Sequence, residues 1–185
     1  EKTDHMQQRK QIIFRFRIAL FLLPLFCGGE KAAAQDYSLA ERLGYSAELM
    51  AEGFGEDHSF LTLDVRLRFA LSPYFSVFVP FDGSELLYDK RGAKHYDFAV
   101  KSGLGLRINH GLHSNGELAA SLAGLSTIGE ANENYWQLRL MGEYVMPASS
   151  RYRSICAIGV EYLAPYDHSS RFGGFYLVVS LGIFL

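Results

Sequence analysis

The stretch of residues 59–71, SFLTLDVRLRFAL, constrains the fold more than any other part of the sequence. From Leu61 to Leu71 every second residue is apolar, and the positions between them are Thr62, Asp64, Arg66, Arg68 and Ala70. Successive side chains of an extended strand point to opposite faces, whereas a helix would scatter these charges around its axis. The stretch therefore predicts a β-strand with one apolar face and one charged face.

The same alternation recurs along the chain and predicts about eight strands. We expect strands over residues 42–52, 59–71, 75–81, 95–108, 117–125, 135–146, 154–163 and 173–185. The connections include a tight turn at residues 72–74 and a long polar loop over residues 82–94. An even number of strands joined by hairpins is typical of an all-β, eight-stranded antiparallel up-and-down barrel.

The amino-terminal region has the pattern of an export signal. A basic region precedes an apolar stretch at residues 18–26, and Ala32 and Ala34 fit the small-x-small cleavage pattern. We expect residues 1–34 to comprise upstream residues and a cleavable signal peptide, and residues 35–185 to form the barrel domain. A retained anchoring helix is one alternative, and a lipid-modified Cys27 is another, although Phe26 before it is not small.

The composition bears on which solvent each face meets. The chain is 49% hydrophobic and 14% aromatic with a formal net charge of -2, which does not indicate a nucleic-acid-binding protein. The interior of an eight-stranded barrel is just wide enough for side chains, and rows of Leu and Phe from all strands would crowd it. We therefore predict apolar rows facing lipid and a nearly neutral network of interior ion pairs formed by Glu48, Asp64, Arg66, Arg68, Asp97, Lys101, Arg107, Arg139, Glu143 and Glu161.

The carboxyl end carries a resemblance to a known class. Phe175, Leu177, Val179, Leu181, Ile183 and Leu185 form an alternating apolar row to the last residue. The row resembles the terminal strand by which bacterial outer-membrane barrels are recognised for assembly, a signal that usually ends on an aromatic residue, whereas here Phe184 is penultimate. By pattern over the mature chain, the sequence resembles small outer-membrane β-barrel proteins of the OmpA-barrel and OmpX class.

The resemblance implies a porin-like transmembrane barrel in the outer membrane of a Gram-negative cell envelope. It implies contacts with lipid, lipopolysaccharide and the barrel-assembly machinery, and a structural or surface-interaction role through extracellular loops. We expect a monomer with no cofactor, no metal and no nucleic-acid partner. The charged aromatic tip Tyr88, Asp89, Lys90 and Arg91 would suit lipopolysaccharide phosphate or a partner protein.

Two alternative functions remain open. The segment at residues 110–115 resembles the His-x-Ser-Asn segment of lipid A deacylases, which makes His113 and Ser114 weak catalytic candidates for an acyl hydrolase. These two residues are adjacent and would point to opposite faces of a strand, and the topology places them at the periplasmic end. The other alternative is a soluble periplasmic barrel that binds an apolar ligand. His58, His95 and His168 fall in expected loops without metal-ligand spacing.

Overall fold

A computed structural model describes residues 42–53, 58–90, 93–111, 116–129, 134–147, 152–166 and 173–185. The chain divides into two units, residues 1–36 and 37–185, and every described residue belongs to the second. The predicted signal peptide over residues 1–34 lies outside the described residues. No helix in the described ranges is long and apolar enough to cross a membrane.

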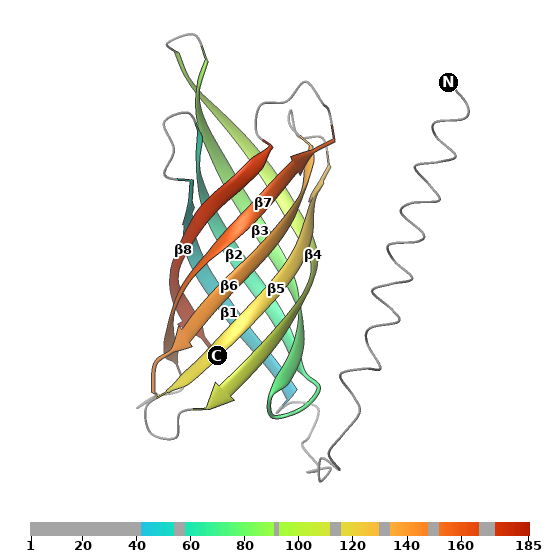
Figure 1. The fold of residues 1–185 in the computed structure, drawn as a ribbon, viewed down its shortest axis with the longest axis vertical. Helices are drawn as coiled ribbons and strands as arrows, with labels where there is room; N and C mark the ends of the chain where they lie inside the picture. Colours follow the sequence, from blue (N-terminus) through green and yellow to red (C-terminus); the bar gives the residue numbers. More distant parts are fainter. Residues whose placement is uncertain are drawn as a thin grey trace, which may run out of the picture. The chain divides into compact units, whose positions relative to one another are not determined.

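The second unit is a closed barrel in which each strand pairs antiparallel with its sequence neighbours and β8 pairs with β1 (Figure 1). Its strands are β1 (Leu43–Glu52), β2 (His58–Ala70), β3 (Phe75–Lys90), β4 (Ala93–Gly111), β5 (Glu117–Ile128), β6 (Tyr135–Val145), β7 (Arg153–Pro165) and β8 (Gly174–Phe184). The prediction of an all-β, eight-stranded antiparallel up-and-down barrel is confirmed.

The two ends of the barrel differ in their connections. We call the end where β1 begins and β8 finishes the basal end; it also carries the connections at residues 71–74, 112–116 and 146–152. The opposite, apical end carries the connections after β1, β3, β5 and β7. Both termini of the barrel lie at the basal end because the strand number is even.

The predicted loop over residues 82–94 is wrong. β3 continues to Lys90 and β4 begins at Ala93, so most of this segment is a strand pair. Figure 1 shows the β3–β4 hairpin extending past the other strands at the apical end. The polar composition predicted a loop, but the period-two alternation of a strand continues through the segment. Asp82, Ser84 and Leu86 are buried, whereas Phe81, Glu85 and Leu87 are exposed.

Period-two alternation places the two side-chain sets on opposite faces of the wall. In β2, Asp64 and Arg66 are buried, whereas Leu63, Val65 and Leu67 are exposed on the outside. The other strands keep this order: outer positions are mostly large and apolar, and inner positions mix charged, small and a few large apolar residues. A shift of any strand by one residue would exchange the two sets, so the pattern fixes the register.

One interior contact requires glycine. Phe78 on β3 lies directly opposite Gly105 on β4, and its ring occupies the space where a Cβ of Gly105 would stand. Phe78 is buried and packs with Ala123 and Leu125 of β5. The missing side chain at Gly105 thus makes room for the buried ring of Phe78 near the basal end of the interior.

We predict that Gly105→Ala destabilises the barrel by about 1 to 3 kcal/mol, because the added methyl displaces the Phe78 ring from a filled interior. The measurement is the urea-unfolding midpoint of the purified, folded chain. Gly124→Ala on the neighbouring strand β5 is the control, since nothing lies within 4 Å of its added Cβ. Equal midpoints for the two variants would contradict the contact.

Candidate functional site

The barrel interior holds the largest concentration of ionisable groups in the described residues. Eleven charged side chains are no more than 5% exposed: Glu48, Glu52, Asp64, Asp82, Glu143, Glu161, Arg66, Arg68, Lys101, Arg107 and Arg139. Their formal charges nearly cancel, with six acids and five bases. Near-balance is required because an unpaired buried charge costs several kcal/mol.

Arg139 of β6 is the centre of the half of this network that lies nearer the apical end. Its Nη1 lies 3.1 Å from Asp64 Oδ2, and its Nη2 lies 2.7 Å from Asp82 Oδ2 and 3.3 Å from Glu52 Oε1. Its Nε lies 3.3 Å from Glu161 Oε2. One guanidinium therefore contacts carboxylates from four strands, a use of the planar fork of donors that lysine could not reproduce.

The position of Arg139 offsets a like-charge pair. Asp64 of β2 and Asp82 of β3 lie directly opposite each other in the register, an arrangement that repels when both are ionised. Arg139 contacts both carboxylates, and Lys101 Nζ lies 3.5 Å from Asp82. Lys101 also donates to Gln137 Oε1 at 2.9 Å, and Gln137 donates to Glu161.

Glu143 of β6 is the centre of the half of the network that lies nearer the basal end. Its Oε1 accepts from Arg66 Nη1 at 2.8 Å and from the Ser121 hydroxyl at 2.5 Å, and its Oε2 accepts from Arg107 Nε at 2.6 Å. Arg66 also contacts Glu48 Oε1 at 3.2 Å. Ser180 of β8 donates to Glu48 Oε2 at 2.7 Å.

Asp64 joins the two halves. Its Oδ2 accepts from Arg66 Nε at 2.9 Å and from Arg139 Nη1 at 3.1 Å. The network thus runs without interruption from Glu161 of β7 through Asp64 to Arg107 of β4. It ties together strands that are not neighbours in the wall.

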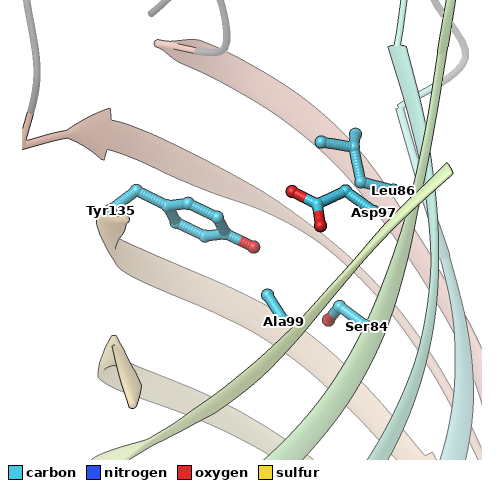
Figure 2. Close-up of a pocket in the computed structure, with 5 residues that line it drawn as sticks. All are labelled: Ser84, Leu86, Asp97, Ala99 and Tyr135. Carbon is cyan, nitrogen blue, oxygen red and sulfur yellow. The ribbon is translucent and has the colours of Figure 1, made fainter. Parts of the chain in front are cut away.

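The apical end of the interior is closed by apolar side chains. Phe60, Leu86, Tyr135 and Leu163 form a buried cluster against which Tyr176 packs, with its ring 5.4 Å from that of Phe60. Beside this cluster lies a small pocket lined by Ser84, Leu86, Asp97, Ala99 and Tyr135. Figure 2 shows the Tyr135 hydroxyl pointing across this pocket toward Asp97.

Nine of the ten residues predicted for the interior network are buried there, and Asp97 lies instead at the apical pocket with intermediate exposure. The Asp97 carboxylate accepts from the Phe98 backbone N–H at 3.0 Å. Arg68 is buried, but no described carboxylate lies within ion-pair distance of it, so its predicted role in an ion pair is wrong for the described residues. Its guanidinium stacks on Phe184 instead.

Sequence reasoning missed several interior partners. Glu52 continues the alternation of Glu48 in β1, and parity alone could have placed it inside. Asp82 falls in the predicted loop, although it continues the inward-facing row of Phe78 and Pro80 in β3. Gln137 has the same parity as Arg139 in the predicted strand over residues 135–146, but its link between Lys101 and Glu161 depends on the register across β4, β6 and β7.

The described residues contain no catalytic or metal site built from the candidate histidines and serine. His113 and Ser114 lie outside the described ranges, and His110 is exposed on β4. His168 also lies outside these ranges, whereas His58 and His95 belong to strands β2 and β4. Within the described part of the chain, no group of His, Cys, Asp and Glu is arranged to hold a metal ion.

The chain matches no protein-family model, and a search of curated proteins finds no match.

We predict that Arg139→Met destabilises the barrel by about 3 to 5 kcal/mol, because it leaves buried carboxylates without their shared counter-ion. Urea unfolding of the folded chain measures the loss. Arg42→Met, which replaces a half-buried arginine before β1, should change the stability by less than about 0.5 kcal/mol. A loss below about 1 kcal/mol for Arg139→Met would mean that the interior is open enough to hydrate these carboxylates.

Proposed function

We propose that the chain is a transmembrane β-barrel of a bacterial outer membrane, delivered there by a cleaved signal peptide. Its role is structural or one of surface interaction at the apical end, and its interior is a filled, stabilising core. The observation that carries the proposal is the polarity of the wall: charged residues are inside and large apolar residues are outside.

The apolar outer surface is extensive and surrounds the barrel. Leu49 on β1, Leu104 on β4 and Leu181 on β8 are 55%, 70% and 69% exposed, and every strand contributes such residues. Soluble monomers rarely expose contiguous apolar patches larger than a few hundred Å². Lipid is the medium in which this surface is stable, and a soluble ligand-binding barrel would have the opposite polarity.

The height of the apolar surface fits a bilayer. The outer row of β2 runs from Leu61 to Phe69, and Leu71 continues it one residue past the end of the strand. From Leu61 to Leu71 the row is about 33 Å long at the rise of an antiparallel strand. A strand tilted by about 45° crosses roughly 23 Å of membrane over that length, which is close to the apolar band of about 25 Å in outer-membrane barrels.

Two bands of aromatic residues border this surface. The apical band includes Phe98, Trp136, Tyr162 and Phe175; the ring of Tyr162 lies 5.8 Å from Trp136 and 4.9 Å from Phe175, across three adjacent strands. The basal band includes the exposed Tyr45, Tyr74 and Tyr152. Leu, Val and Ile predominate between the bands, and aromatic girdles of this kind mark the two interfaces of a bilayer.

The filled interior favours a role at the surface over transport. Ion pairs occupy the middle of the barrel and an apolar cluster closes its apical end. The β3–β4 hairpin extends past the other strands at the apical end, and among the described residues β4 pairs with β5 only from Val100 onward. In the described part of the chain, residues 93–99 thus pair with β3 alone, and their other edge is a place where lipopolysaccharide or a partner protein would bind.

Insertion is tested by refolding the purified chain in the presence of phospholipid vesicles. We expect the barrel to float with the vesicles after extraction at alkaline pH and to keep the apical connections accessible to added protease. A folded chain that stays soluble and separates from the vesicles would contradict the proposal. Recovery in the soluble periplasmic fraction of cells would contradict it as well.

We further predict that Val65→Arg destabilises the vesicle-inserted barrel by about 2 to 4 kcal/mol, because Val65 is at the middle of the outer row of β2. Urea unfolding in vesicles measures the effect. Leu71→Arg at the basal end of the same row is the matched control and should cost no more than about 1 kcal/mol. Equal costs at both positions would mean that this face does not cross a bilayer.

A further inference from the structure

Three guanidinium groups converge on one aromatic ring at the basal mouth of the barrel. The Cζ atoms of Arg68, Arg153 and Arg107 lie 4.3, 4.8 and 5.8 Å from the ring centroid of Phe184. The residues come from β2, β7, β4 and β8, so the cluster exists only because the barrel closes. Three positive charges around one ring repel one another, so anions nearby would stabilise the cluster.

No described carboxylate forms a direct ion pair with Arg68. Glu143 is engaged by Arg66 and Arg107, and Glu117 contacts Arg107 at 2.5 Å and Arg153 at 2.9 Å. Arg68 is only 5% exposed, and its Nε, Nη1 and Nη2 have no hydrogen-bond partner in the described part of the chain. A buried cation in this state costs several kcal/mol unless an anion joins it.

Further donors at the same place also lack acceptors. Arg107 Nη2 and Arg153 Nε have no hydrogen-bond partner among the described residues, and neither do the hydroxyls of Ser46 and Ser76. The register places Ser46 opposite Phe184, and Ser76 opposite Arg107. An acceptor with several oxygens could bind to all of these donors.

We propose that the basal mouth binds a phosphate-type oxyanion, held by Arg68 with Arg107 and Arg153. Guanidinium forks match the oxygens of phosphate in pairs, and stacking on Phe184 fixes the plane of the Arg68 fork. The side chains of Arg153 and Glu117 are 28% and 15% exposed, so the site opens to the basal solvent. The anion is a free phosphate or the phosphate of a lipid headgroup.

This inference goes beyond the proposed function and needs only the closed barrel. Its test is therefore done in phosphate-free, nonionic detergent micelles. A failure to bind phosphate there would not bear on the proposal that the barrel inserts into a membrane. Inorganic phosphate is titrated into the folded full chain at constant ionic strength, with chloride as the balancing anion. Calorimetry and the urea-unfolding midpoint are the two readouts.

We expect saturable heat and a midpoint that rises with phosphate concentration, as ligand binding to the folded state requires. Arg68→Gln should weaken phosphate binding at least about tenfold, which corresponds to about 1.4 kcal/mol. Without phosphate, this variant should be at least as stable as the original chain, because it removes an unpaired buried charge. Arg68→Lys should bind with intermediate affinity, because it keeps the charge but loses the planar fork.

The source of the anion is decided by adding phosphatidylglycerol to the micelles. Competition with inorganic phosphate assigns the site to a lipid headgroup, and no competition assigns it to the free ion. The proposal is overturned if phosphate gives no saturable heat and no midpoint shift in the original chain. It is also overturned if Arg68→Gln binds phosphate as tightly as the original chain does.

Discussion

The neutralisation of charge inside a barrel filled with side chains is the constraint on which the rest of the structure depends. Asp64 accepts from both Arg66 and Arg139 and so links the two halves of the interior network. Each of these groups reaches its partners only in one register, since a shift of one residue turns a strand's charges outward. The network therefore selects the closed eight-stranded arrangement among the ways in which alternating strands could pair.

The same constraint gives the interior an axial order. Apolar side chains around Phe60 and Tyr135 close the apical end, ion pairs fill the middle, and arginines around Phe184 lie at the basal mouth. Each charged group in the middle forms an ion pair or a hydrogen bond with another group of the chain, although some carboxylates keep one oxygen without a hydrogen-bond partner. Arg68 at the mouth, in contrast, forms no ion pair with a described carboxylate. Interactions with other molecules are thus expected at the two ends of the barrel and along its apolar outer wall.

The sequence was sufficient for the architecture because strand alternation is local. It placed the strand containing Val65 and Arg66 correctly, and the closed topology followed from an even count of hairpins. It failed at residues 82–94, where polar composition concealed an alternation that continues into the β3–β4 hairpin. It could not pair Arg139 with four carboxylates or leave Arg68 without one, because both outcomes depend on side-chain reach across non-adjacent strands.

A barrel that spans a membrane, as proposed, must have the outer face of β2 in contact with lipid. The test places spin labels on single cysteines introduced at Leu61, Leu63, Val65, Leu67 and Leu71, in a chain whose Cys27 and Cys156 are replaced by alanine, and uses reconstituted vesicles. Collision with oxygen, which concentrates in the bilayer, should be greatest at Val65 and fall toward Leu71, and collision with a water-soluble nickel complex should show the reverse. Strong collision of the nickel complex with the labels at Leu63 and Val65 would contradict the claim.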